Sequence, residues 1–348
     1  MSTMARATAR SRNVPATLRA DALVVDRPGR ASLRPVALRA PGATDAVVRT
    51  ALTGVSTGTE RLLFDGSMPP FPGLAYPLVP GYEAVGTVVD GGDDVALAPG
   101  TRVFVPGSSH YADGVAGLFG ASAATLVTAE SRVVPIGALA EEEATLLALT
   151  GTAVHAIAVG ARRARPGAAL SLAEVAEEAP DLVVGHGVLG RLVARVAIAL
   201  GAPAPLVLET DPARADGGRG YEVVRPDEVD GSGRTFRRAV DVSGAGGDHL
   251  GRLVGRAARG GRITLAGFYA EPLRFDFPPA FLKEIAIDVA AEWVPDDLRL
   301  ALALVETGAL GLDGLVTDRA RAADAARAYP DAFADGARLK TVLDWREP

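Results

Sequence analysis

A glycine-rich hexapeptide, GHGVLG at residues 185–190, carries the clearest chemical signal in the sequence. It follows a short apolar run and precedes a stretch with helical spacing. In a strand–turn–helix unit, Gly185 permits the tight turn, Gly187 lets the backbone approach a pyrophosphate, and Gly190 lets the helix pack closely on the sheet. The free N–H groups of the first helical turn, which starts with Val188 and Leu189, then bind the phosphates. The pattern predicts a dinucleotide-binding site.

An acidic residue stands where such a site needs one. Glu209 follows the next apolar run, 24 positions after Gly185. A carboxylate at this point accepts hydrogen bonds from the adenosine ribose 2′-hydroxyl and repels a 2′-phosphate, so the predicted cofactor is NAD. Asp211 competes for this role, and Arg214 leaves NADP open. The alternative is a glycine turn in an α/β core that binds no cofactor.

Oxidation of an alcohol by such a cofactor also requires a group that takes the hydroxyl proton. The candidates are acidic, hydroxyl-bearing and imidazole side chains: Thr57, Thr59, Glu60, Tyr82, Glu83, His110 and His155. His155 lies in an apolar helical stretch, where a lone histidine either catalyses or packs in the core. Thr57 could relay protons or bond to the backbone of its glycine turn. His186, inside the hexapeptide, is predicted to be structural.

Alternating strands and helices are predicted to position the dinucleotide site. The predicted strands are Leu182–Val184, Leu206–Leu208, Ala239–Val242 and Arg262–Leu265, and the predicted helices are Val188–Leu200 and His249–Ala258. This alternation indicates a doubly wound parallel sheet. Ser243 and Gly267 follow two of these strands, so we expect both at the carboxyl edge of the sheet, near the cofactor.

The rest of the chain divides around this unit. Residues 1–19 are predicted to form a flexible tail, and 20–150 a β-rich catalytic domain with short apolar runs broken by Gly and Pro. The proline-rich segment Met68–Pro80 is expected to be a stiff loop. Its aromatic residues Phe71 and Tyr76 could together form a flat apolar wall or only pack within the loop. Residues 151–290 form the predicted nucleotide-binding domain, and about 291–348 complete the catalytic domain. The predicted elements of that last stretch are helices Asp296–Thr307 and Ala320–Tyr329 and a strand, Lys340–Leu343.

The composition of the chain argues against several classes of function. The 348 residues carry a net charge of −6, which argues against nucleic acid as the main partner. The chain has no cysteine, which excludes disulfides, thiolate nucleophiles and thiolate metal sites. No stretch approaches the roughly 18 apolar residues of a membrane span. A cytoplasmic enzyme with a small-molecule substrate is the resulting expectation.

Three short segments resemble the zinc-binding segments of the medium-chain dehydrogenase/reductase superfamily. TGVS (53–56) resembles Thr-Gly-Val-Cys, PGYE (80–83) resembles Pro-Gly-His-Glu, and LLA (146–148) resembles Leu-Leu-Cys. The resemblance extends over residues 20–343 and implies an α/β fold, with a GroES-like β-rich catalytic domain and a Rossmann domain. The three ligand positions here hold Ser56, Tyr82 and Ala148, which are poor zinc donors. The resemblance therefore predicts a site without metal.

The superfamily also implies roles for single residues. Tyr82 occupies a vacated ligand position, so its hydroxyl should point into the cleft, either as an acid/base partner or as a space-filler. Glu83 is expected either to support the site residues without contacting the substrate or to act as a catalytic residue itself. Thr152 matches a threonine beside the nicotinamide, and Lys340 resembles a basic residue that contacts the pyrophosphate. A homo-oligomer is implied as well.

Longer blocks resemble the bacteriochlorophyllide a dehydrogenases, a zinc-free family within this superfamily. They are GVSTGTER (54–61), MPPFPGLAYPLVPGYE (68–83), RVFVPG (102–107), GLFG (117–120) and PDLVVGHGVLGR (180–191). The resemblance implies NAD-dependent oxidation of a 3-(1-hydroxyethyl) group on a bacteriochlorophyllide to 3-acetyl, in bacteriochlorophyll a biosynthesis. The alternatives are a zinc-free dehydrogenase/reductase of other alcohol or ketone specificity and a non-catalytic nucleotide-binding protein.

Overall fold

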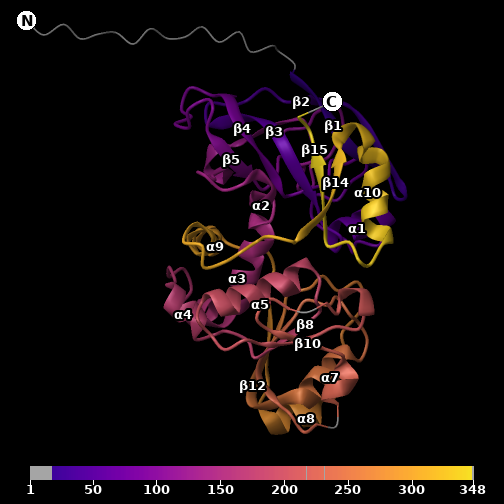
Figure 1. The fold of residues 1–348 in the computed structure, drawn as a ribbon. Helices are drawn as coiled ribbons and strands as arrows, with labels where there is room; N and C mark the ends of the chain where they lie inside the picture. Colours follow the sequence, from indigo (N-terminus) through magenta and orange to yellow (C-terminus); the bar gives the residue numbers. More distant parts are fainter. Residues whose placement is uncertain (1–17, 217, 231, 347–348) are drawn as a thin grey trace, which may run out of the picture.

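The computed structural model describes residues 18–216, 218–230 and 232–346. Figure 1 shows two lobes, with the N-terminal strands in one and the middle of the chain in the other. The yellow C-terminal segment lies in the same lobe as the indigo N-terminal strands. The chain therefore leaves the first lobe, builds the second and returns.

The first lobe is built on β-strands. β1 (Leu18–Arg27) and β2 (Arg30–Leu38) pair antiparallel, and a larger sheet runs in the order β14-β15-β3-β4-β5-β7, with β6 pairing β3. The bounds are β3 Asp45–Val55, β4 Ala84–Gly91, β5 Arg102–Val105, β6 Thr125–Ala129, β7 Val134–Pro135, β14 Val316–Arg321 and β15 Lys340–Asp344. Short helices lie between them: α1 Thr59–Asp65, η1 Glu130–Arg132 and α2 Glu141–Ala144. β15 pairs antiparallel with β3, so the C-terminus completes this lobe.

The second lobe is a parallel sheet in the order β10-β9-β8-β11-β12-β13. The strands are β8 Leu182–Val184, β9 Leu206–Leu208, β10 Glu222–Val224, β11 Phe236–Asp241, β12 Ala257–Leu265 and β13 Ala286–Val289. The helical segments are α4 Leu172–Ala176, α5 Val188–Ala199, η2 Pro212–Arg214, α6 Pro226–Val229, α7 His249–Arg256 and α8 Phe277–Lys283. β8 lies between β9 and β11, where the strand order reverses. In doubly wound sheets, ligands bind at the carboxyl ends of the strands beside such a reversal.

Two helices join the lobes. α3 (Leu147–Ala164) crosses the expected boundary at residues 150 and 151, and it packs against α5 and α9 (Pro295–Glu306). Their apolar side chains share one core cluster, which includes Leu146, Val154 and Leu300. Because α3 contacts both lobes, it fixes the walls of the space between them.

The structure corrects one predicted element near the C-terminus. The predicted helix Ala320–Tyr329 is strand β14 at its start, followed by η3 (Ala322–Asp324) and then α10 (Ala325–Ala334), which contains Pro330. Helical spacing of alanines obscured the strand, which forms because β15 offers it a parallel partner. The predicted tail lies outside the described residues up to position 17, whereas Leu18 and Arg19 begin β1.

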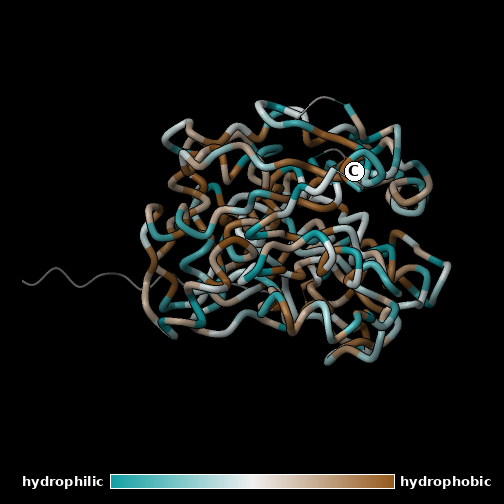
Figure 2. The backbone as a smooth tube through the Cα atoms, turned by 90° about the horizontal axis from the view of Figure 1, so that it is seen from below, coloured by the Kyte–Doolittle hydropathy of each residue, from teal (hydrophilic) through white to brown (hydrophobic). Residues whose placement is uncertain are grey.

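Apolar and polar stretches alternate over short distances along the backbone (Figure 2). In the described part of the chain, no helix has the length and apolarity needed to cross a membrane.

Candidate active site

A large cleft lies between the lobes. It encloses about 2010 Å³, and its walls come from α1, the loop before β4, the turns after β8, β9, β11 and β12, and helix α9. Pockets for a single drug-sized ligand usually enclose about 300–1,000 Å³. The cleft is therefore large enough for a dinucleotide and a bulky second ligand together.

The glycine hexapeptide forms a tight turn at the floor of this cleft. Gly185 has φ +97°, a conformation that favours glycine, and α5 begins directly after Gly187. A Cβ on Gly190 would lie 1.8 Å from the carbonyl oxygen of Gly185, whereas a Cβ on Gly187 would meet only Arg214, at 3.7 Å. Val188 and Leu189 line the cleft in the first turn of α5. The turn is thus closed on its protein side and open toward the cleft, as a pyrophosphate requires.

Glu209, directly after β9, is hydrogen-bonded to the glycine turn. Its Oε2 accepts a hydrogen bond from the His186 amide at 2.8 Å, and its Oε1 accepts from the amides of Thr210 at 2.6 Å and Asp211 at 2.8 Å. The Thr210 hydroxyl also donates to Oε1, at 3.4 Å, whereas Oε2 accepts only the His186 amide and so can accept a second bond, from a ribose hydroxyl. Glu209 lines the cleft, as the sequence-based role requires.

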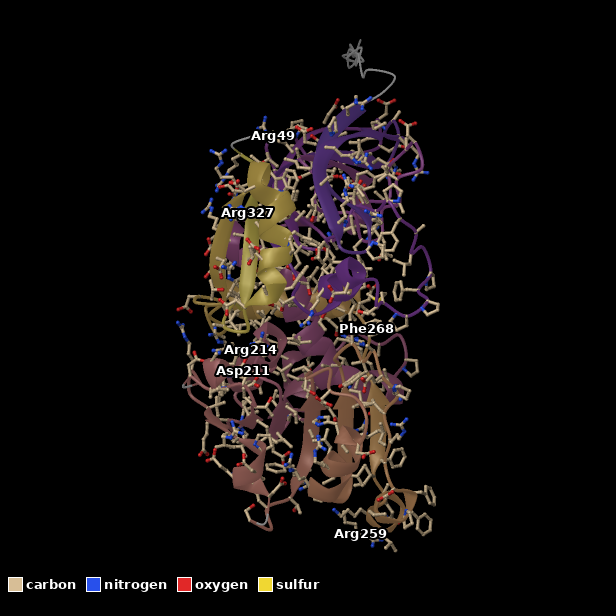
Figure 3. The ribbon with its side chains drawn as sticks, turned by 90° about the vertical axis from the view of Figure 1, so that its right-hand side faces the viewer. Arg49, Asp211, Arg214, Arg259, Phe268 and Arg327 are labelled. Carbon is tan, nitrogen blue, oxygen red and sulfur yellow. The ribbon has the colours of Figure 1, made fainter. Side chains whose placement is uncertain are left out.

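The two competing residues also lie at the cleft. Asp211 caps η2 by accepting from the Ala213 amide at 2.9 Å, and Arg214 donates from Nε to the Gly336 carbonyl at 2.6 Å. Figure 3 shows both where the lobes meet. His186, in contrast, is buried, with Nδ1 2.7 Å from the Arg214 carbonyl and Nε2 2.9 Å from the Tyr221 hydroxyl. Burial lowers the pKa of His186, which suits a structural imidazole.

Ser243 and Gly267 both line the cleft at the carboxyl ends of β11 and β12. The Ser243 hydroxyl donates to Asp241 Oδ1 at 2.7 Å. A Cβ on Gly267 would lie 3.0 Å from the Gly244 amide nitrogen, a tight contact that favours glycine where these two turns meet. Thr152, on α3, also lines the cleft, and its hydroxyl donates to the Ala148 carbonyl at 2.9 Å.

Tyr82 and Ser56 form the polar pair on the opposite wall. The Tyr82 hydroxyl donates to Ser56 Oγ at 2.7 Å, and both residues line the cleft with Thr57 and Thr59. Burial raises the pKa of Tyr82, and the nearby carboxyl of Glu83 raises it further. The phenol therefore stays protonated at neutral pH, where it can donate a hydrogen bond but is a poor base.

The three superfamily ligand positions do not fit zinc. Ser56 and Tyr82 offer neutral hydroxyls that bond to each other, and Ala148 offers no donor atom. Structural and catalytic zinc sites use thiolate, imidazole or carboxylate ligands. In residues 18–216, 218–230 and 232–346, no group of three such side chains is placed to hold a metal ion.

Glu83 and Lys340 form a buried ion pair behind Tyr82. The ammonium of Lys340 lies 2.8 Å from Oε1 and 2.6 Å from Oε2 of Glu83, and both side chains are at most 1% exposed. Burial raises the pKa of Glu83, and Lys340 opposes that shift. A Cβ on Gly54 would lie 2.1 Å from this carboxylate, so glycine there makes room for the pair. Lys340 lines the cleft, but its ammonium is bound to Glu83, which weakens the case for the predicted pyrophosphate contact.

His155 is not among the residues that line the cleft. Its Nδ1 is 2.7 Å from Oδ2 of Asp297 on α9, and Oδ1 of the same carboxylate accepts from Arg162 Nε at 2.7 Å. This network joins α3 to α9. The placement opposes the catalytic role considered for His155, since a proton acceptor must reach the reacting hydroxyl. His110 similarly pairs with Asp45, at 3.0 Å.

An aromatic wall adjoins Tyr82, and sequence reasoning found only part of it. Phe119 packs edge-on against Tyr82 with ring centroids 5.3 Å apart, and it lies 6.2 Å from Phe71. Phe119 has φ +65°, which is costly for an aromatic residue and often marks a functional site. The flanking glycines of GLFG (117–120) were the available signal. Tyr76, expected beside Phe71, instead donates to the Leu63 carbonyl.

Comparison with known proteins supports this arrangement. Residues 42–138 match the family model described as "Alcohol dehydrogenase GroES-like domain". Among solved structures, L-idonate 5-dehydrogenase from Escherichia coli aligns with a TM-score of 0.77 and 16% identity, over 94% of this chain and 99% of that one. An NADH complex of the E. coli CFT073 alcohol dehydrogenase rspB aligns with a TM-score of 0.76 and 19% identity, over the same shares. These likenesses establish the fold.

Two curated relatives are much more similar in sequence. Both are named 2-desacetyl-2-hydroxyethyl bacteriochlorophyllide A dehydrogenase. The protein from Rhodobacter capsulatus is 48% identical over 307 residues, which cover 88% of this chain and 92% of that protein. The protein from Cereibacter sphaeroides is 45% identical over 333 residues, which cover 94% and 99%. With this identity over nearly the full length, the chain belongs to the bacteriochlorophyllide A dehydrogenase family of the medium-chain dehydrogenase/reductase superfamily and is a dehydrogenase.

Proposed function

We propose that this protein oxidises the hydroxyethyl side chain of a bacteriochlorophyllide to an acetyl group, with NAD as the acceptor and without zinc. The names of the two relatives describe a substrate in which hydroxyethyl replaces acetyl, so oxidation of that carbinol gives the acetyl product. The observation that carries the proposal is the Tyr82–Ser56 hydroxyl pair, which stands at the metal-ligand positions and faces the dinucleotide turn across one cleft.

The choice of NAD rests on Glu209. Its carboxylate lies at the end of β9, held by three backbone amides, where it would accept from a ribose 2′-hydroxyl and repel a 2′-phosphate. Gly187, Val188 and Leu189 would hold the pyrophosphate at the start of α5. When bound, the nicotinamide supplies the hydride acceptor. Thr152, Ser243 and Gly267 line the part of the cleft where the nicotinamide ring would lie.

The hydroxyl pair would bind and orient the alcohol. Tyr82 stays protonated, so it can donate to the substrate oxygen, while Ser56 Oγ can accept from or donate to the same oxygen. Two positioned hydroxyls fix the carbinol without a Lewis acid. Thr57 lies beside them as a further relay hydroxyl. The carbinol carbon is attached to a conjugated ring system, which stabilises positive charge as hydride leaves.

The cleft also suits a flat, apolar substrate. Phe71, Phe119 and Tyr82 form a continuous aromatic wall, and Trp293, Leu298 and Met68 extend the apolar lining. Aromatic side chains contribute about 0.5–1.5 kcal/mol per stacked or edge-on ring pair beyond simple burial. Phe268 also lines the cleft, and Figure 3 shows it where the lobes meet. A macrocycle could therefore lie along this wall with its hydroxyethyl group toward Tyr82.

The test is direct. Purified protein is mixed with 3-(1-hydroxyethyl) bacteriochlorophyllide and either NAD or NADP, and the absorption spectra of pigment and NADH are followed. We expect pigment conversion with equal formation of NADH, and a slower reaction with NADP. Faster turnover of small secondary alcohols would favour a dehydrogenase of other specificity. Cofactor binding without turnover of any alcohol would favour a non-catalytic nucleotide-binding protein.

We also propose that the protein forms a homo-oligomer in the cytoplasm. β13 lies at the end of the parallel sheet order, and the neighbouring helix α8 exposes 67% of Phe277, 65% of Phe281 and 67% of Leu282. An exposed apolar helix beside a sheet edge suits contact with a second copy. Sedimentation velocity of the purified protein tests this, and a monomer at micromolar concentration would contradict it.

A further inference from the structure

The proposed substrate carries a carboxylate for which neither the Tyr82–Ser56 pair nor the aromatic wall supplies a partner. A bacteriochlorophyllide is the free acid of the pigment, and its ring system bears a propionate side chain that is esterified to a long alcohol in the corresponding bacteriochlorophyll. Burial of an unpaired carboxylate is costly. An enzyme that binds this ring along an apolar wall therefore needs a cation near the place where the propionate leaves the wall.

Most of the cations that line the cleft already have a partner. Carboxylates bind four of them, in the pairs Arg61–Asp65, Arg256–Asp230, Arg299–Asp296 and Lys340–Glu83. Two more belong to the Rossmann lobe and form hydrogen bonds there, in the pairs Arg214–Gly336 and Arg252–His249. Arg132 also lines the cleft, but within the described part of the chain its guanidinium makes no hydrogen bond and no ion pair.

The local backbone directs Arg132 toward the cleft. It is the last residue of η1, and the chain is extended at the next residue, Val133, with φ −88° and ψ 133°. Successive side chains of an extended chain point to opposite faces. Val133 is buried in the core of the first lobe, whereas Arg132 and Val134 both line the cleft. The guanidinium therefore lies on the same face of the chain as Val134.

The neighbours of this face belong to the proposed substrate site. Val134 packs in one apolar cluster with Tyr82 and Trp293, which line the same cleft. β5 and β7 pair antiparallel, and continuing their register by two residues places Arg132 opposite Pro106, a further lining residue. Arg132 thus lies at the edge of the wall along which the macrocycle would bind.

A hydroxyl group accompanies this guanidinium. Ser131 lines the cleft beside Arg132, and among the described residues its side chain also has no hydrogen-bond partner. A guanidinium can donate two parallel N–H bonds to one carboxylate, and a hydroxyl can donate a further bond to the remaining acceptor positions. Both residues are exposed, so a carboxylate bound to them would lie at the mouth of the cleft. This position suits a flexible substituent at the edge of a flat ring.

We propose that Arg132, together with the Ser131 hydroxyl, binds the propionate carboxylate of the pigment and makes the enzyme selective for the free acid over the esterified pigment. The inference rests on the proposed oxidation of a bacteriochlorophyllide. Arg132 would hold one edge of the macrocycle while Tyr82 and Ser56 bind the hydroxyethyl group, and two such anchors fix the orientation of the ring. No bond forms or breaks at Arg132, so it is a specificity residue.

The first experiment compares two substrates that differ only at the propionate. They are 3-(1-hydroxyethyl) bacteriochlorophyllide and its propionate methyl ester, each oxidised with NAD by the full-length protein. In the wild type, the KM for the ester should be about fivefold higher than for the acid, the upper end of what partly exposed ion pairs contribute. The kcat should be similar, because the hydroxyethyl group is the same in both.

Arg132→Gln should raise the KM for the acid about fivefold, to the value for the ester, and leave the KM for the ester unchanged. Arg132→Lys keeps the charge but not the paired N–H groups, so it should restore part of the selectivity. Equal KM values for acid and ester in the wild type would overturn the inference. An equal rise for both substrates in Arg132→Gln would also overturn it, since that result indicates a structural effect.

Two further arginine variants serve as controls. Arg49 is an exposed arginine of the same lobe that does not line the cleft, and Figure 3 shows it far from the place where the lobes meet. Arg49→Gln should keep the selectivity of the wild type. Arg61→Gln removes another arginine of the first lobe that lines the cleft. Selectivity that is lost in Arg61→Gln but kept in Arg132→Gln would overturn the assignment to Arg132.

A binding measurement separates this inference from the proposed oxidation. Quenching of pigment fluorescence, recorded without NAD, gives the Kd of the acid and of the ester for the wild type and for Arg132→Gln. Selective binding by the wild type alone, without oxidation of either pigment, would contradict the proposed oxidation and support the role of Arg132. Oxidation of both pigments with equal Kd values would support the oxidation and overturn the role of Arg132. Absence of pigment binding would overturn both.

Discussion

The two walls of the cleft differ in how far their residues depart from the pattern of the superfamily. The dinucleotide wall keeps every feature that its motif demands, from the turn at Gly185 to the carboxylate of Glu209. The opposite wall, where the alcohol is proposed to bind, is called the alcohol wall. It keeps the fold of the superfamily but has Ser56 and Tyr82 at positions that bind metal in zinc-dependent members. A backbone cradle for phosphate depends on glycine geometry and tolerates little change, whereas the group that activates an alcohol can be exchanged for another.

The largest expected effect is on the dinucleotide wall. Gly190→Ala places a Cβ 1.8 Å from the Gly185 carbonyl oxygen, which the turn can relieve only by moving. Overpacking of this kind costs about 3 kcal/mol. If the distorted turn loses that much binding free energy, NAD affinity should fall roughly 100-fold. Isothermal titration calorimetry measures this. Gly255→Ala, where a Cβ meets nothing within 4 Å, is the control and should bind NAD normally. Unchanged binding by Gly190→Ala would remove the turn from the cofactor site.

The next effect falls on the alcohol wall. Tyr82→Phe removes the phenol that donates to Ser56 and should lower kcat about 100-fold, within the range for a lost proton-transfer or hydrogen-bonding group. NAD affinity should not change. Steady-state kinetics and calorimetry on the same preparations separate the two. Tyr76→Phe, at a tyrosine outside the cleft lining, should keep its kcat. Equal kcat in Tyr82→Phe and the wild type would make Tyr82 a space-filler.

Cofactor preference is the third test. Glu209→Gln keeps the shape of the side chain but removes the charge that would repel a 2′-phosphate. The ratio of kcat/KM for NAD over NADP should fall about tenfold, since hydrogen bonds to charged groups contribute roughly 1.5–3 kcal/mol. Glu222→Gln, on an exposed position of β10, is the matched control. A wild-type preference for NADP would refute the role given to Glu209.

The smallest effect concerns the aromatic wall. Phe119→Gly removes the ring between Phe71 and Tyr82 at a backbone position, φ +65°, that glycine adopts freely. The KM for the macrocycle should rise about fivefold, as expected from one lost ring contact of roughly 1 kcal/mol. The thermal midpoint should stay close to that of the wild type. An equal rise in KM for a small alcohol would show that the wall does not recognise the macrocycle.

Local features were predictable from the sequence. β8 and β9 begin and end where the sequence placed them, and α5 differs by one residue, because a short apolar run that ends at a glycine turn or at polar residues specifies its own boundaries. The GroES-like and Rossmann fold assignment, the superfamily and the family were confirmed. The placement of Glu209 in the cleft followed from its distance to the glycines.

Features that depend on distant partners were not predictable in this way. Lys340 was assigned to the cofactor, but its partner is Glu83, which lies 257 positions away. His155 was considered for catalysis, but Asp297 from α9 holds it in a network between helices. Phe119 was overlooked because its value comes from an unusual φ and from neighbours on two other segments. Glu60 was named among many candidates, but the structure buries it fully.

The central claim is that hydroxyl side chains, and no metal, activate the alcohol. The most direct measurement is the rate of NAD-dependent pigment oxidation by protein treated with a strong zinc chelator, with the metal content determined on the same sample. The account predicts an unchanged rate in metal-free protein and no gain when zinc is added back. Loss of activity on chelation, with recovery on addition of zinc, would contradict it.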